Sequence, residues 1–159
     1  MKTHKGKWHG VMLHHTAGTQ AETVASIRKT HITKNKWGDI GYHYVLEIKN
    51  GKGYLKTGRS LKYQGAHAGI DKYNNGYIGL CIPGNYETGK MPDSIYSDII
   101  NAICRLYEKM NEVQGSCSYG FLGHREVKAT ACPGKNINLN KIRNDLSKKL
   151  NKTVKAIKL

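Results

Sequence analysis

Short apolar runs alternate with stretches of helical periodicity along almost the whole chain, and this alternation limits the folds that it can adopt. The apolar runs have the length and residue content of β-strands. We expect strands at 10–14, 42–48, 53–57, 78–82 and 119–122. No internal repeat or low-complexity linker interrupts the pattern. An α/β fold, with a mixed central β-sheet flanked by helices, is the simplest assembly of these elements.

Local signals predict where the elements begin and end. Asn50-Gly51 is a strong hairpin turn, so 53–57 should return antiparallel to the strand before it. The segment from Thr19 to Glu22 has the pattern of a capping box, and it predicts a helix from Gln20 to about Thr33. The longest helix should follow Pro92-Asp93, where apolar residues recur at helical spacing: Ile95, Ile99, Ile103, Leu106 and Met110. We expect residues 58–77 to form a long connection.

The C-terminal stretch combines an apolar face with many lysines. Its apolar residues fall roughly on one helical face: Ile142, Leu146, Leu150, Val154 and Ile157. Such a helix can pack on the domain or lie on an anionic membrane surface. We expect packing up to Leu150, and beyond it either a fraying tail or a surface-binding arm. Residues 1–150 should therefore form a single domain, and residues 151–159 a basic tail.

Length and cysteine content agree with one soluble domain. The chain has 159 residues, enough for one sizeable core and short for two domains. No stretch approaches the roughly 20 apolar residues of a membrane span, and no apolar region of a Sec signal follows the basic N-terminus. Four cysteines invite a two-disulfide interpretation, but Cys81 and Cys104 fall at apolar positions where free cysteine is common. A reduced chain is typical of a protein made in the cytoplasm.

The charge of the chain favours an anionic partner. The formal net charge of +15 comes from 26 Lys and Arg against 11 Asp and Glu. Such an excess attracts polyanions at long range. Nucleic acid is the usual partner, but the chain has no basic helix-turn-helix, zinc-finger repeat or RNP-type aromatic strand, so we expect none. Anionic wall polymers or an acidic membrane surface would be attracted equally well, although for any single lysine simple solvation is the better interpretation.

Two histidines and a cysteine have the chemistry of a zinc site with one open position. His14 lies in an apolar run, and His124 and Cys132 lie eight residues apart. Zinc favours imidazole nitrogen and thiolate sulfur, and three protein ligands leave a fourth position for water or substrate. His15 competes with His14, because successive strand side chains point to opposite faces and periodicity cannot choose between them. Spacing alone therefore does not establish the site.

Four sequence blocks around these residues carry a family resemblance. In chain order they read LHHTAG, WGDIGYHYVL, GAHAGIDKYNNGYIGL and GHREVKATACPG. They resemble the zinc-dependent N-acetylmuramoyl-L-alanine amidases of the phage T7 lysozyme and peptidoglycan recognition protein type, from about Leu13 to Pro133. The resemblance implies that residues 1–150 are a catalytic amidase domain with its groove at one edge of the sheet. It assigns His14, His124 and Cys132 as zinc ligands and leaves His15 either as a support for the ligands or as a packing residue.

The resemblance also implies which groups assist catalysis. Zinc lowers the pKa of bound water towards ~7 and polarises an amide carbonyl, so a further group must stabilise the oxyanion and manage the proton. Tyr42, in the GYHY block, matches the catalytic tyrosine of the family. Thr130 is the second assisting position. The phage T7 type has a lysine there, so this chain departs towards the recognition-protein amidases, and binding of a phage RNA polymerase is not carried over. Glu126 is a lesser alternative as a general base.

Substrate contacts follow from the same resemblance. His67 and Asn74 match groove-lining positions and are the expected substrate-binding residues, while Trp37 and Arg59 are further candidates. The expected activity is hydrolysis of the amide between N-acetylmuramic acid and L-alanine in peptidoglycan. The expected protein is a monomeric phage or prophage endolysin, made in the cytoplasm without a Sec signal and acting on the wall after release. A non-catalytic module that recognises peptidoglycan is the alternative, and the presence of Cys132 favours the enzyme.

Overall fold

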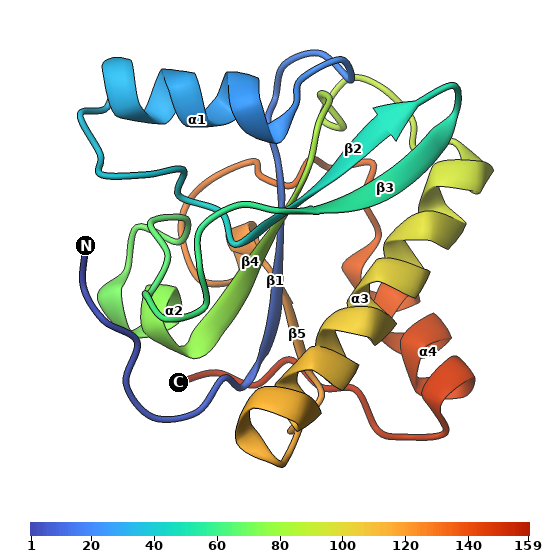
Figure 1. The fold of residues 1–159 in the computed structure, drawn as a ribbon. Coiled ribbons are helices and arrows are strands. Elements are labelled where there is room, and N and C mark those ends of the chain that lie inside the picture. Colours follow the sequence, from blue (N-terminus) through green and yellow to red (C-terminus); the bar gives the residue numbers. More distant parts are fainter.

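The computed structural model describes residues 1–159 and contains one five-stranded sheet in the order β3-β2-β4-β1-β5 (Figure 1). The strands are β1 (Gly10–His15), β2 (Tyr44–Lys49), β3 (Lys52–Thr57), β4 (Tyr77–Ile82) and β5 (Gly120–Gly123). The helices are α1 (Val24–Thr33), α2 (Asp71–Gly76), α3 (Asp93–Gln114) and α4 (Leu139–Leu150), and a short 3-10 turn, η1 (His124–Glu126), follows β5. The expected α/β fold with a mixed sheet is confirmed.

The pairing of the strands is mixed, as expected. β1 lies between β4 and β5 and is parallel to both, and β2 is parallel to β4. β3 returns antiparallel to β2 through Asn50 and Gly51, whose φ angles are 51° and 73°. Two successive residues with positive φ form the type of tight turn that matches the twist of a hairpin. The hairpin prediction is therefore confirmed.

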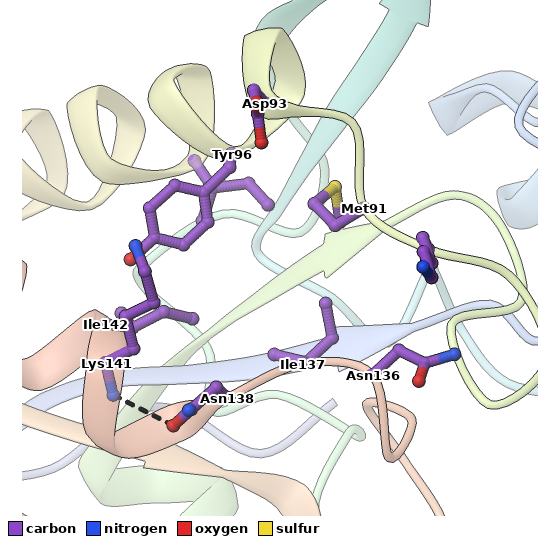
Figure 2. Close-up of a pocket in the computed structure, with 10 residues that line it drawn as sticks. Met91, Asp93, Tyr96, Asn136, Ile137, Asn138, Lys141 and Ile142 are labelled. Carbon is purple, nitrogen blue, oxygen red and sulfur yellow. Dashed lines mark hydrogen bonds between the residues drawn. The ribbon is translucent and has the colours of Figure 1, made fainter.

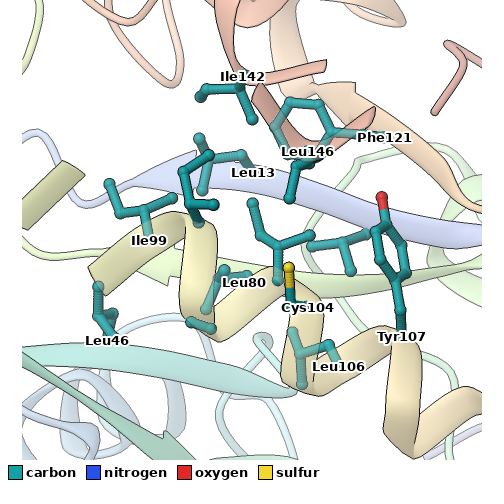
Figure 3. Packing of buried hydrophobic residues seen from close by; sticks show 14 of the residues in the cluster. Leu13, Leu46, Leu80, Ile99, Cys104, Leu106, Tyr107, Phe121, Ile142 and Leu146 are labelled. Carbon is teal, nitrogen blue, oxygen red and sulfur yellow. The ribbon is translucent and has the colours of Figure 1, made fainter. Parts of the chain in front are cut away.

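The two faces of the sheet bury different clusters. Val11 and Leu13 of β1 point into the main core, which α3 and α4 cover (Figure 3). Met12 packs on the opposite face, in a smaller cluster with Tyr73 of α2. In Figure 1, α1 and α2 lie on one side of the central strands, and α3 and α4 lie on the other. Because strand side chains alternate, His14 lies on the face of Met12, away from the main core.

The long helix is the best-predicted element. α3 begins after Pro92 and ends before Gly115, which has a φ of 75°. All of the residues that predicted its buried face are buried: Ile95, Ile99, Ile103, Leu106 and Met110. None of the helices is both long and apolar enough to cross a membrane.

The start of α1 was predicted too early. The capping box is formed by Thr23 and Ser26, not by Thr19 and Glu22. The Thr23 hydroxyl accepts from the Ser26 amide at 3.2 Å, and the Ser26 hydroxyl accepts from the Thr23 amide at 2.9 Å. Both segments have a hydroxyl residue followed three positions later by a polar partner, so the pattern alone did not distinguish them.

The connection expected at 58–77 contains a helix that the sequence did not indicate. α2 is short and contains two asparagines and a terminal glycine, all weak helix formers. The strand expected from Tyr42 begins at Tyr44. The carbonyl of Tyr42 accepts from the Arg59 amide at 2.9 Å, so this part of the chain is bonded to the loop that follows β3. Tyr42 is therefore a loop residue at the entrance to β2.

The C-terminal residues pack along β5 and do not continue α4. Asn151 ends the helix in a left-handed conformation with a φ of 52°. The Phe121 amide then donates to the Lys155 carbonyl at 2.8 Å, and the Lys155 amide donates to the Tyr119 carbonyl at 3.2 Å. The Val154 side chain is buried in the main core. The helical face predicted through Ile157 thus ends at Leu150, and the structure shows a docked segment where a fraying tail or a free arm was expected.

We predict that Val154→Ala destabilises the protein by about 1–3 kcal/mol, because it leaves a cavity where α4 and the tail cover the sheet. Lys155→Ala is the matched control, since its side chain is exposed and only its backbone bonds to β5. Chemical denaturation of both variants checks the prediction. Equal and negligible effects would mean that the tail is detached in solution.

Candidate metal centre

The three predicted ligands lie together. His14, His124 and Cys132 each offer one donor atom, and these atoms all lie within 4.8 Å of one another. His14 comes from β1, His124 from the turn that follows β5, and Cys132 from the next loop. β5 is the edge strand beside β1, so the group lies near that edge, on the sheet face opposite α3. The predicted grouping of these residues is confirmed.

His14 is fully enclosed and its ring is held at one end. Its Nε2 lies 2.9 Å from Nδ1 of His67, and its Nδ1 faces the Cys132 sulfur at 3.6 Å. Burial, with smaller contributions from His67 and His124, lowers the pKa of His14 well below its ordinary value. The imidazole is therefore neutral near pH 7, which is the form that binds a metal ion.

His124 is oriented by a backbone carbonyl. Its Nε2 lies 2.9 Å from the oxygen of Ala68. A carbonyl can only accept, so Nε2 carries the proton and Nδ1 keeps a free lone pair. Burial lowers the pKa of His124, and nearby Lys128 acts in the same direction. The His124 ring centroid lies 4.7 Å from that of His14.

Cys132 is fixed by hydrogen bonds of its backbone. Its amide donates to the Thr130 hydroxyl at 3.3 Å, and its carbonyl accepts from the Arg125 amide at 2.8 Å. The sulfur accepts from the His15 amide at 3.4 Å. Burial raises the pKa of the Cys132 thiol to about 11, so without a cation nearby the thiol stays protonated at neutral pH.

These donors fit a zinc ion. Two neutral imidazole nitrogens and a sulfur form the ligand set of a catalytic zinc site, and the group contains no fourth His, Cys, Asp or Glu. A bound cation would favour the thiolate over the thiol and so offset the effect of burial on Cys132. His15, the competing ligand, instead accepts from the Tyr86 amide at 3.1 Å through its Nδ1. The His15 side chain is thus engaged outside the ligand group, while its backbone amide contacts the Cys132 sulfur.

The two residues predicted to assist catalysis lie beside the three predicted ligands. The Tyr42 ring centroid is 5.3 Å from that of His14. Burial, followed by the neighbouring Cys81 and Cys132, raises the pKa of Tyr42 well above its ordinary value, so the phenol keeps its proton. The Thr130 hydroxyl accepts from the Cys132 amide, and its own proton remains free to donate.

The two residues predicted to bind substrate are engaged within the protein. Both ring nitrogens of His67 are bonded, one to His14 at 2.9 Å and the other to the Tyr77 carbonyl at 3.0 Å. The Asn74 side-chain oxygen accepts from the amides of His67 at 2.9 Å and Ala68 at 2.8 Å. Substrate binding by these residues stays a prediction, and their observed contacts lead towards the metal ligands.

The other candidates lie outside the ligand group. Glu126 is held by Arg143 through two bonds of 2.9 Å and also accepts from the Gly123 amide. Burial alone would raise the pKa of Glu126, but these hydrogen bonds outweigh it and lower the value. Arg59 donates to the carbonyls of Ile40 and Gln64, and so ties two loops together. The Trp37 ring is partly exposed and packs against His31.

Sequence reasoning missed several groups because they act through the backbone. The Ala68 carbonyl and the His15 amide contact ligands directly, yet any residue type could supply them. Arg125 was also missed, although its guanidinium donates to the carbonyls of Gly134 and Ile137 at 2.7 and 2.6 Å. Its position one residue after a ligand is the only signal that could have indicated this role.

A cavity of about 340 Å³ lies away from the ligand group (Figure 2). It is lined by residues near the start of α3 and of α4, including Tyr96, Ile137 and Lys141. None of the ligand group lines it, and its lining comes from α3, α4 and the segments that precede them. The cavity is therefore separate from the candidate metal centre.

We predict that the purified protein binds one equivalent of zinc and that Cys132→Ser removes or greatly weakens this binding. Cys117→Ser is the control, because Cys117 is also a free, partly buried cysteine but belongs to no ligand group. Elemental analysis after dialysis against metal-free buffer checks the prediction. Zinc retained equally by both variants would show that another site holds it.

Comparison with known proteins gives the family. A family model described as N-acetylmuramoyl-L-alanine amidase (Amidase_2) matches residues 4–135. Peptidoglycan-recognition protein SC1a of Drosophila melanogaster is 36% identical over 134 residues, which cover 79% of this chain and 68% of that protein. A variant of Drosophila PGRP-LB in complex with tracheal cytotoxin has a TM-score of 0.71 at 27% identity, covering 89% of this chain and 83% of that one.

A bacterial structure has a similar fold at lower identity. The endolysin amidase LysCS from Clostridium intestinale has a TM-score of 0.73 at 24% identity, covering 96% of this chain and 92% of that one. A likeness at this identity shows the fold alone. The match over most of the chain and the identity to the Drosophila protein show that the chain belongs to the Amidase_2 and peptidoglycan recognition protein family.

Proposed function

We propose that the protein is a zinc-dependent N-acetylmuramoyl-L-alanine amidase, which hydrolyses the amide between N-acetylmuramic acid and L-alanine in bacterial peptidoglycan. The observation that carries the proposal is the grouping of His14, His124 and Cys132 within 4.8 Å, with no fourth protein ligand. Three ligands and an open position are the arrangement of catalytic zinc. Membership of the Amidase_2 family supports the choice of bond.

The protein's own residues have defined tasks in this proposal. When bound, zinc supplies the Lewis acidity that activates water and polarises an acyl oxygen. Tyr42 keeps its proton at neutral pH and can therefore donate a hydrogen bond to the negative charge that develops on the acyl oxygen. Thr130 can donate a hydrogen bond from its free hydroxyl to the same oxygen. The network around Cys132 holds the sulfur in place, so the site is already organised before substrate binds.

The substrate class is supported by the relatives. Those described above include a peptidoglycan-recognition protein of Drosophila and a structure with tracheal cytotoxin bound. The same relatives support a second candidate function, a module that recognises peptidoglycan without cutting it. The two functions differ in one product, because only the amidase releases new amino groups from the stem peptide.

The setting that we propose is that of a phage or prophage endolysin, made in the cytoplasm and acting on the cell wall after release. All four cysteines are free, which fits synthesis in a reducing compartment. The net charge of +15 would hold the protein on anionic wall polymers or acidic lipids.

We predict that the wild type releases L-alanine amino groups from purified peptidoglycan and that Tyr42→Phe lowers the rate about 100- to 1,000-fold without loss of zinc. Tyr44→Phe is the matched control, since Tyr44 is a partly buried tyrosine that packs on the main core. Amine release and zinc content are measured on the same samples. A zinc-loaded wild type that binds peptidoglycan and releases no amine would identify the recognition module.

We also predict that lysis of whole cells weakens as salt is added, while hydrolysis of a small soluble muropeptide does not. Raising the ionic strength from about 0.01 M to about 0.15 M shortens the Debye length from about 30 Å to about 8 Å, which screens the attraction between the basic surface and the wall. Rates on both substrates across this range provide the measurement. Equal salt sensitivity would contradict a role for surface charge in wall attachment.

A further inference from the structure

Residues 66–68 contact both histidine ligands of the candidate metal centre. His67 bonds to His14 through its side chain, and Ala68 bonds to His124 through its carbonyl. This segment lies between β3 and α2, far in sequence from either ligand. Two ligands from different elements thus contact successive residues of one segment.

The hydrogen bonds determine which nitrogen of each ring carries a proton. The Tyr77 carbonyl can only accept, so Nε2 of His67 carries the proton and its Nδ1 accepts. His14 must then donate through Nε2, which leaves the Nδ1 lone pair towards Cys132. The Ala68 carbonyl fixes His124 in the same way. Both ligands are therefore held with Nδ1 free and directed into the centre.

Asn74 holds the shared segment in place. Its side-chain oxygen accepts from two successive amides, those of His67 and Ala68, at 2.9 and 2.8 Å. Its own carbonyl accepts from the Gly65 amide at 2.9 Å. One side chain on α2 thus fixes both the residue that orients His14 and the residue that orients His124.

The His67 ring is closely packed against two glycines. A Cβ added at Gly65 would lie 2.3 Å from Cδ2 of the ring, and one at Gly79 would lie 2.6 Å from it. Contacts this short do not occur in folded proteins, so the ring fills a slot that depends on two glycines. Its side chain is almost completely shielded from solvent. A ring in this slot can orient a neighbour, but it has no free nitrogen for a substrate.

We propose that His67 and Asn74 are positioning residues for the zinc ligands, and that residues 66–68 form one support that orients His14 and His124 together. The inference rests on the zinc binding in the proposed function and is independent of amide hydrolysis. It gives these residues a different role from the substrate contacts that the sequence predicted. Partners that orient ligating histidines typically contribute about 10- to 100-fold to metal affinity.

The first test measures zinc affinity by competition with a chromophoric chelator in the absence of substrate. His67→Leu removes the acceptor for His14, and we expect it to weaken zinc binding by about 10- to 100-fold. His67→Asn keeps an acceptor oxygen close to the position of Nδ1, and we expect a smaller loss. Long-range nitrogen NMR of the zinc-free proteins should show His14 protonated at Nε2 in the wild type and in mixed tautomers in His67→Leu.

The second test compares two neighbouring asparagines. Asn75 makes two similar bonds, but to the backbone of Lys5 at 2.8 and 2.9 Å. Thermal unfolding of the zinc-free proteins should show similar structural costs for Asn74→Ala and Asn75→Ala. Only Asn74→Ala should weaken zinc binding, because only Asn74 holds residues 66–68.

The outcomes distinguish failure of the inference from failure of the proposed function. Tight zinc binding by the wild type, with unchanged affinity in His67→Leu and Asn74→Ala, would overturn the inference alone. If His67 and Asn74 contact substrate instead, the same variants should lose peptidoglycan binding while they keep their zinc affinity. A wild type that binds no zinc would overturn the proposed function and this inference together, whereas a zinc-binding wild type without amidase activity would leave the inference standing.

Discussion

The register between β1 and β5 is the constraint on which the candidate centre depends. Leu13 is opposite Gly123, so β5 ends beside the last residues of β1, and His124 begins the turn that follows. The pleat of β1 then sends Leu13 into the core under α3 and turns His14 to the other face. A shift of one residue would bury His14 in the main core and place Leu13 at the ligand group. The packing of the core therefore determines which histidine faces the metal.

Burial shifts the pKa values of the two histidines and of the cysteine in opposite directions, yet it favours the uncharged form of all three. It lowers the pKa values of His14 and His124 and raises that of Cys132, so each group favours its uncharged form. The group therefore carries no buried charge in the absence of a cation, and the fold does not need an ion to offset one. A cation changes the balance at the sulfur, because the thiolate is the form that binds it. The site can thus be fully built by the fold and still select a cation that prefers nitrogen and sulfur.

The sequence predicted features that depend on neighbouring residues better than contacts between residues that are distant in the chain. The strand pattern, the buried face of α3 and the grouping of His14, His124 and Cys132 followed from periodicity, zinc chemistry and family resemblance. The start of α1 did not, because two similar capping patterns lie four residues apart. The docking of Val154 and the bonds of His67 and Asn74 depend on partners that are distant in sequence, and several of those partners are backbone groups. The type of a residue does not indicate a partner of this kind. The family resemblance could therefore identify these positions but could not predict their contacts.

The positive charge of the chain is divided between two chemical roles. Four of the five arginines are tied into the architecture: Arg28 to Asp39, Arg59 to the Ile40 carbonyl, Arg125 to the Gly134 carbonyl and Arg143 to Glu126. A guanidinium suits this task because its planar donors can hold several oxygens at once. Most lysines are exposed and not paired with a carboxylate, so they supply the long-range field. Arg143 fixes the chain on either side of His124, at Phe121 and Glu126, and Arg125 fixes the chain that follows Cys132. The groups that build the site are therefore distinct from those that would attract a wall polymer. Surface charge could therefore change considerably without altering the geometry of the centre.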